Sequence, residues 1–230
     1  MSSALLTGLL GVALGMRHAL EPDHLAAVST LAAEQKSTRD SLKLGALWGF
    51  GHSVTLLLVG GSLALLEQQM PMQVANGFEL LVAVVIVLLG VRALHTAWSE
   101  GRTGAVAAHT HSSLTHVHAA PVEHIHVSRL TLATRPLLIG ILHGLAGSGA
   151  LTAMVISHLN SGAARLGYIA LFGAGSMVGM ALLTGLVGAS LSKWAKAPRV
   201  AAGLLGIAGI VSLLIGVAWG IEATSQLLGA

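Results

Sequence analysis

The sequence contains no cysteine and few charged or aromatic residues. The absence of cysteine from all 230 positions excludes disulfides and thiolate metal ligands. Only 9% of the residues are charged and 3% are aromatic, whereas 54% are hydrophobic. A water-soluble domain of this size carries about a quarter charged residues. A lipid environment for most of the chain is the simplest explanation of the missing charge.

Six long apolar stretches are separated by short polar segments. Each is long enough for an α-helix that crosses a bilayer, which needs about 20 mainly apolar residues. None alternates polar with apolar residues, as the strands of a membrane barrel do. Glycine is abundant, with 29 residues, and small residues let membrane helices approach closely. We therefore predict an all-α integral membrane protein, a single domain over 1–230 with six transmembrane helices. The stretches are 4–33, 45–66, 79–98, 136–158, 166–191 and 200–222.

Basic residues gather in alternate connections between these stretches. They follow the first, third and fifth stretches, and the other connections carry only Arg165. Because short loops rich in Lys and Arg stay in the cytoplasm, we place these three loops inside and both termini outside the plasma (inner) membrane. The distribution also explains the net charge of +3 without a nucleic-acid partner. Indole rings favour the membrane interface, and we expect them there at Trp48, Trp98, Trp194 and Trp219.

Short matches between the two halves of the chain indicate an internal repeat. Three stretches in each half force the second half into the opposite orientation, an arrangement common in transporters, whose substrate sites lie near the membrane midplane. We predict an inverted three-plus-three repeat, with 1–98 and 131–230 joined by a cytoplasmic loop at 99–130. The matching pairs are Gly15 and Gly140, His18 and His143, Leu20 and Leu145, Gly90 and Gly216, and Val91 and Val217.

Ionisable side chains crowd into the middle of the first stretch. It reads Arg17-His18-Ala19-Leu20-Glu21-Pro22-Asp23-His24, and such groups at membrane depth are costly and usually functional. On an unbroken helix, two histidines six positions apart would diverge by about 240°. Pro22 removes the N–H that the His18 carbonyl would otherwise accept. A local break there turns both imidazoles and the Asp23 carboxylate toward one centre, and leaves the carbonyl free for a ligand or a water molecule.

Two imidazoles and a carboxylate form a site for a divalent transition metal. Imidazole suits nickel, cobalt, zinc, copper and iron, whereas magnesium and calcium prefer oxygen ligands alone. We predict that Arg17, Glu21 and Pro22 support this site. The alternative is a structural polar cluster in which Arg17 pairs with Glu21 one helical turn away.

Two further histidines lie at membrane depth. His52 follows Gly51 and precedes Ser53, small residues that permit close approach to the first stretch, and we assign Ser53 a supporting role. His143 is the repeat partner of His18, so the two should meet at the midplane from opposite sides. The alternative for each is a histidine that is satisfied within the core. The predicted metal ligands are His18, Asp23, His24, His52 and His143.

The loop at 99–130 is polar and rich in histidine. It holds three His-x-His pairs, and residues two positions apart in extended chain share a face, so each pair can chelate weakly. A cytoplasmic collector or sensor of metal and a solvated linker are equally good interpretations. The histidines concerned are His109, His111, His116, His118, His124 and His126.

The segment His18-x(4)-Asp23-His24 resembles the His-x(4)-Asp-His signature of the nickel/cobalt transporter family. Gly51-His52-Ser53 is similar to a Gly-His-Ser motif in that family's next helix. The resemblance implies roles in metal selection and transport for these residues. The region 143–150 lacks the carboxylates of the longer members, and so resembles a short branch linked to urease accessory transport proteins.

The expected function is transport of a divalent transition-metal ion, nickel or cobalt, across a membrane. The ion is then a substrate and not a fixed cofactor, and the lipid bilayer is the main partner. A cytoplasmic metallochaperone or a second copy of the chain are further candidate partners. We expect no enzymatic activity; the alternative is a membrane-embedded metal-dependent hydrolase or oxidase. No Gly-x(4)-Gly-Lys-Ser/Thr nucleotide loop occurs in the sequence.

Overall fold

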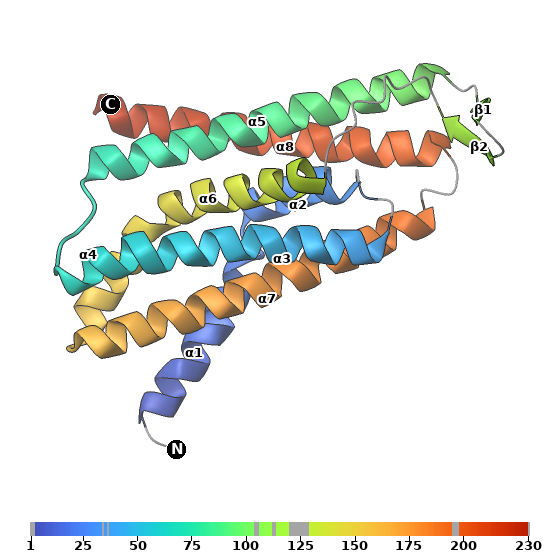
Figure 1. The fold of residues 1–230 in the computed structure, drawn as a ribbon. Coiled ribbons are helices and arrows are strands. Elements are labelled where there is room, and N and C mark those ends of the chain that lie inside the picture. Colours follow the sequence, from blue (N-terminus) through green and yellow to red (C-terminus); the bar gives the residue numbers. More distant parts are fainter. Residues whose placement is uncertain are drawn as a thin grey trace.

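Long helices that run side by side form most of the molecule (Figure 1). The computed structural model describes residues 3–33, 35, 37–103, 106–111, 114–119, 129–194 and 198–229. The longest helices are α5 (Met72–Thr103), α6 (Arg129–His158), α7 (Gly162–Trp194) and α8 (Pro198–Leu228). A fifth long helical segment consists of α3 (Thr38–Thr55), a π-helical turn η1 (Leu56–Gly60) and α4 (Gly61–Leu65).

Five helical segments in the described part are long and apolar enough to cross a membrane. They are Thr38–Leu65, Met72–Ser99, Thr134–His158, Gly162–Ser190 and Arg199–Leu228. They correspond to five of the six predicted stretches, and the prediction of a helical membrane protein is confirmed at this level. The first predicted stretch is instead divided into two shorter helices, α1 (Ser3–His18) and α2 (Pro22–Ala33).

The break between α1 and α2 lies where the sequence places Pro22. Pro22 begins α2, a position at which a helix tolerates proline because the N–H there has no helical partner. One detail of our prediction is wrong: the carbonyl of His18 is not free. The N–H of Glu21 donates to it at 3.0 Å, so a tight turn replaces the lost helical bond.

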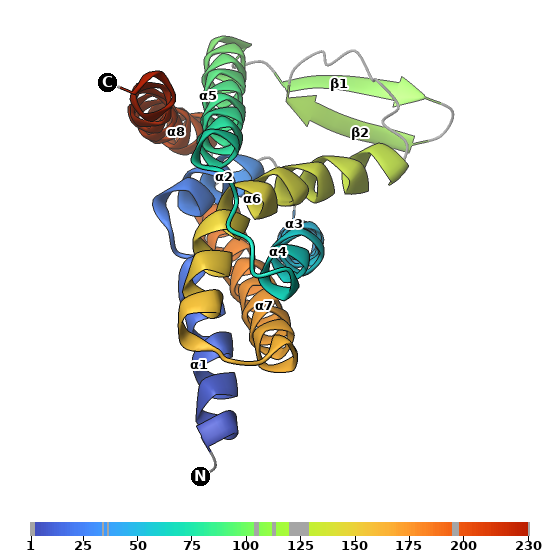
Figure 2. The same cartoon turned by 90° about the vertical axis from the view of Figure 1, so that its left-hand side faces the viewer.

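The helices pack in pairs that join the two halves of the chain. Figure 2 shows α5 with α8 on one side of α2 and α6, and α3 with α7 on the other. In addition α1 packs on α7, α6 packs on α3, α2 contacts α8, and α6 contacts α5. Two crossings bring backbones together: a Cβ on Gly15 would collide with the carbonyl of Phe172, and one on Gly140 with the carbonyl of Trp48.

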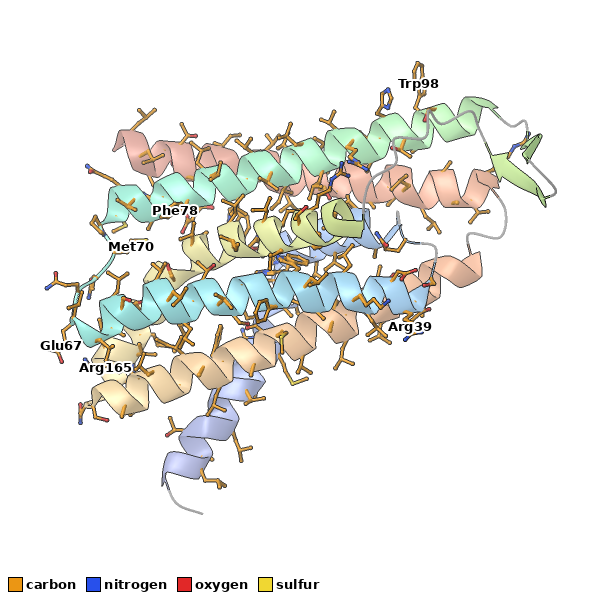
Figure 3. All side chains as sticks on the ribbon, viewed as in Figure 1. Arg39, Glu67, Met70, Phe78, Trp98 and Arg165 are labelled. Carbon is orange, nitrogen blue, oxygen red and sulfur yellow. The ribbon has the colours of Figure 1, made fainter. Side chains whose placement is uncertain are left out.

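The tryptophans do not share one environment, which corrects the expectation that all lie at the interface. Trp48 is 0% exposed and packs in the core with Val28 and Met180. It is internal because α3 begins at Thr38, well before the apolar stretch that we delimited, so Trp48 lies almost three turns inside the helix. Trp98 is 62% exposed and projects from one end of α5 (Figure 3). The side chain of Trp194 lies outside the described residues.

The histidine-rich segment contains two short antiparallel strands, which the all-α prediction did not include. They are β1 (Val106–His111) and β2 (Leu114–Ala119), with His109 opposite His116 in the register. In both strands histidine alternates with threonine or valine, a period of two that is typical of a strand. His124 and His126 lie outside the described residues.

Candidate metal site

Four histidines from four helices meet at the break in the first stretch. His18 is the last residue of α1, and His24 lies in the first turn of α2. Their ring centroids are 4.7 Å apart, because the turn at 19–21 reverses the divergence that an unbroken helix would impose. His52 of α3 lies 5.1 Å from His18 and 5.6 Å from His24, and His143 of α6 lies 5.2 Å from His24, centroid to centroid.

The spacing of the ring nitrogens is suitable for a shared ion. One nitrogen of each of His18, His24 and His52 lies within 4.8 Å of the other two. The rings are removed from solvent: His24, His52 and His143 are 0–2% exposed. Polar atoms buried in this way normally have a hydrogen-bond partner. In the described part, however, the Nε2 atoms of all four histidines have none.

Neighbouring acceptors set the tautomer of three of these rings. Nδ1 of His18 contacts Oε1 of Glu21 at 2.9 Å, and Nδ1 of His24 contacts Oδ1 of Asp23 at 2.8 Å. Nδ1 of His143 donates to the carbonyl of Ile139 at 2.9 Å. Carbonyls and ionised carboxylates only accept, so each Nδ1 carries the hydrogen and each Nε2 presents a lone pair. This is how histidines are arranged around a metal ion.

Aromatic rings border the histidines on two sides. Trp48 stacks on His24 with centroids 5.4 Å apart and planes 18° apart, and its edge meets the ring of His143 at 5.4 Å. Phe172 of α7 lies 5.3 Å from His18. Sequence analysis did not identify either ring as part of the site. The signal was available for Trp48, which precedes His52 by four positions and therefore lies on the same face of α3.

A cavity of about 660 Å³ reaches the histidines from one end of the bundle. His18, His24 and His143 are among the residues that line it. Its walls include the C-terminal part of α8, where Glu222 and Gln226 lie, and Glu79 near the start of α5. The cavity is large enough to admit water and ions to the histidines. Glu79 and Glu222 were also missed from sequence, since each lies in a different, mainly apolar helix.

The predicted supporting residues lie close to the site, in different roles from those expected. Glu21 pairs with His18, whereas the alternative interpretation paired it with Arg17; Arg17 lines the cavity. Ser53 donates to the carbonyls of Gly49 and Gly173 at 2.7 and 2.6 Å, and so ties α3 to α7 beside His52.

Comparison with known proteins identifies the family. Residues 4–226 match the family model described as high-affinity nickel-transport protein. The chain belongs to this family. This nickel-transport family member is thus a multi-pass membrane protein that transports a transition-metal ion.

Two relatives illustrate the breadth of the similarity. The family member is 34% identical over 209 residues to the urease accessory protein UreH of Bacillus sp. (strain TB-90), covering 90% of this chain and 87% of that protein. It is 28% identical over 212 residues to the chloroplast protein FOR GROWTH AND FERTILITY 1 of Arabidopsis thaliana, covering 90% of this chain and 56% of that protein. No solved structure matches the chain.

Proposed function

We propose that the transported ion binds transiently among the Nε2 atoms of His18, His24 and His52, with His143 as a fourth ligand. The observation that carries this proposal is the set of buried Nε2 atoms without a hydrogen-bond partner in the described part. Leaving a buried polar atom unpaired costs about 1–3 kcal/mol. Four such costs in one place are hard to explain by packing and are offset when an ion binds there.

Two carboxylates complete the proposed site without being its main ligands. Asp23 and Glu21 orient His24 and His18 through their Nδ1 atoms. A divalent ion at membrane depth also needs negative charge nearby to offset its desolvation. Asp23 is the stronger candidate for that role, because its side chain is 10% exposed and that of Glu21 is 52% exposed.

A nitrogen-rich site is consistent with nickel and equally with cobalt. Imidazole ligands bind both ions, and the geometry of the ligands and the supply of metal decide between them. We propose nickel as the principal substrate, on the basis of family membership, and cobalt as a competing one. Family membership also favours transport over the alternative of a metal-dependent hydrolase or oxidase, which would retain a fixed metal.

We further propose the inverted repeat, in which α1 with α2, α3 and α5 correspond to α6, α7 and α8. The support comes from close contacts of glycine residues: several contacts made by glycines in one half have equivalents made by the matching glycines in the other half. These contacts are Gly15 with Phe172 and Gly140 with Trp48, Gly175 with Val12 and Gly51 with Leu137, and Gly90 with Leu213 and Gly216 with Val87. A recurring set of this kind is expected from a pseudo-two-fold axis in the membrane plane.

The proposed topology has six crossings, with α1 and α2 together forming the first. The basic connections then lie in the cytoplasm and both termini outside the plasma membrane. The cavity opens at the end of the bundle where α8 ends, and hence toward the outside. In this orientation the histidine-rich segment faces the cytoplasm, where it can collect metal or meet a metallochaperone. A homo-oligomer is compatible with the same arrangement.

The experiment that tests the site uses the protein purified in detergent and reconstituted in vesicles. A double variant, Asp23→Asn with His24→Ala, is expected to lose nickel binding by calorimetry and nickel flux into vesicles. The matched control is His95→Ala with His158→Ala, because both histidines are exposed. Wild-type nickel binding and flux in the first variant would refute the proposed site. Stoichiometric nickel that survives purification with a chelator would favour the enzyme alternative.

A further inference from the structure

Within the described part of the chain, one cavity reaches the site. The cavity connects it with one end of the bundle, and α2 leads from the site toward the other end. On that second side the core is tightly packed: Ala27, Val28 and Met180 are 0% exposed. Trp48 belongs to this cluster and does not line the cavity. An ion that enters through the cavity must displace part of this cluster to leave in the opposite direction.

Trp48 lies directly between the histidines and the closed side. Its ring stacks on His24 and meets His143 edge-on, so it covers two of the proposed ligands at once. Its Nε1 is buried without a hydrogen-bond partner in the described part of the chain. The indole is therefore held by ring contacts and packing alone, and it can leave its place without breaking a hydrogen bond.

The proposed repeat gives Trp48 a counterpart on the open side. Trp48 corresponds to Phe172 because their carbonyls meet equivalent glycines. The carbonyl of Trp48 meets Gly140, and that of Phe172 meets Gly15. His143 corresponds to His18. Phe172 lies 5.3 Å from His18, just as Trp48 lies 5.4 Å from His143. The two rings occupy equivalent positions, but only Phe172 lines the cavity.

We propose that Trp48 is the gate that closes the site on the side opposite the cavity, and that Phe172 closes the cavity side in the alternate state. The two halves would exchange conformations during transport. Trp48 would then line an open cavity, as Phe172 does here, and Phe172 would be packed in the core, as Trp48 is here. The inference rests on the proposed transport site. It assigns Trp48 a role in occlusion, and it requires no contact of the indole with the ion.

Thiol labelling of single-cysteine variants tests the gate, because the chain has no native cysteine. Val28→Cys reports on the closed side, and Ala150→Cys reports on the cavity, which Ala150 lines. With a water-soluble reagent and the full-length protein in detergent, we expect Ala150→Cys to react quickly and Val28→Cys slowly. Adding Trp48→Ala or Trp48→Leu should increase the labelling rate of Val28→Cys by about tenfold or more and leave that of Ala150→Cys unchanged.

Two companion variants separate the gate from general packing. Trp48→Phe keeps a flat ring over His24 and forfeits no hydrogen bond, so labelling should stay slow and nickel flux should persist. Trp98→Ala removes the exposed indole of α5 and should change neither quantity. Nickel binding should survive in Trp48→Leu. Vesicles that contain this variant should, however, leak nickel across the membrane, whereas vesicles with Trp48→Phe should not.

Several outcomes would overturn the gate while leaving the metal site in place. One is slow labelling of Val28→Cys in both Trp48→Ala and Trp48→Leu with nickel binding retained. Another is fast labelling of Val28→Cys in the presence of Trp48, since that side would then be open. Unfolding of both variants in gel filtration would make Trp48 a packing residue. Retained nickel binding in the Asp23→Asn, His24→Ala variant would instead refute the proposed function, whatever the labelling shows.

Discussion

In the proposed metal site, Asp23 orients its neighbour His24. The carboxylate accepts from Nδ1, which fixes the tautomer and aims the Nε2 lone pair at the other imidazoles. Such partners of metal-binding histidines are usually worth 10–100-fold in metal affinity. Glu21 holds His18 in the same way from a more exposed position, so water can replace it more easily.

Asp23→Asn is expected to weaken nickel binding by about 10–100-fold, with normal expression. The amide oxygen can still accept from His24, so the loss reports the missing negative charge. Calorimetric titration of the purified variant with nickel measures it. Glu21→Gln is the matched control, and should change affinity only a few-fold. An equal loss in the two variants would contradict the difference that we infer from their burial.

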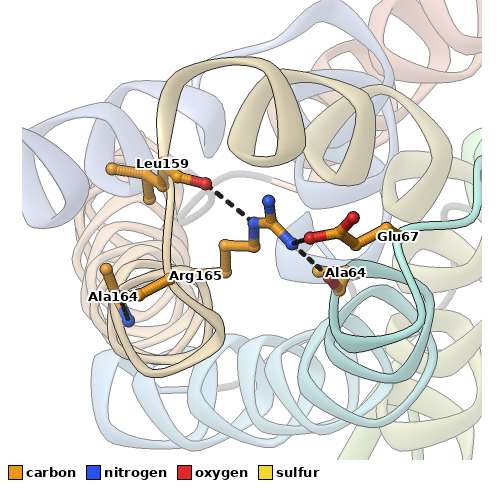
Figure 4. Close-up of polar contacts among 6 residues, drawn as sticks. Ala64, Glu67, Leu159, Ala164 and Arg165 are labelled. Carbon is orange, nitrogen blue, oxygen red and sulfur yellow. Dashed lines mark hydrogen bonds and ion pairs between the residues drawn. The ribbon is translucent and has the colours of Figure 1, made fainter.

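At the scale of elements, Arg165 connects the ends of three helices. Its guanidinium donates to the carbonyls of Leu159 at 2.8 Å and Ala64 at 3.0 Å, and pairs with Glu67 at 2.8 Å (Figure 4). The side chain is 8% exposed, although it lies at an end of the bundle. It therefore ties the start of α7 to the ends of α4 and α6.

Replacing Arg165 should reduce stability more than replacing its ionic partner. Arg165→Ala leaves two carbonyls without their donor, at about 1–3 kcal/mol for each that stays buried. Glu67→Gln removes an ion pair whose acid is 68% exposed, and such pairs contribute about 0–1 kcal/mol. Thermal unfolding in detergent distinguishes the two. A larger shift of Tm in Glu67→Gln would show that the ion pair dominates.

The contact between α6 and α3 depends on Gly140. A methyl group there would overlap the carbonyl of Trp48, and overpacking of this kind costs about 1–3 kcal/mol. We expect Gly140→Ala to lower Tm and to impair nickel flux, because the displaced backbone carries the gate. Gly203→Ala is the control, since nothing lies within 4 Å of a Cβ built there. Equal stability of the two variants would argue against close contact at this crossing.

For the whole molecule, the side of the membrane on which each connection lies can be tested directly. We expect Ser2→Cys to react with an impermeant thiol reagent in intact cells and Ser112→Cys to be protected. The reason is that basic loops are retained in the cytoplasm, and Ser112 lies in a basic loop. Permeabilised cells, in which both should react, provide the control. The reverse pattern in intact cells would invert the topology.

Composition and motif spacing were sufficient to predict the class of protein, and they also led to the site residues that we propose. The shortage of charge required lipid, and five stretches are helices of membrane-spanning length. The His18-x(4)-Asp23-His24 motif indicated the family through its resemblance to that family's signature, and its costly groups at membrane depth independently indicated a metal site. These features are local, so they can be read from consecutive residues.

What only the tertiary structure decided was which distant residues share the site. Phe172, Glu79 and Glu222 come from separate helices, and no motif spacing along the chain relates them to the histidines. The partner of Glu21 depended on how the turn at 19–21 closes, which placed its carboxylate on His18. Helix packing determines such contacts through the points at which whole helices cross, so the burial of Trp48 and the position of the cavity follow from the assembled bundle.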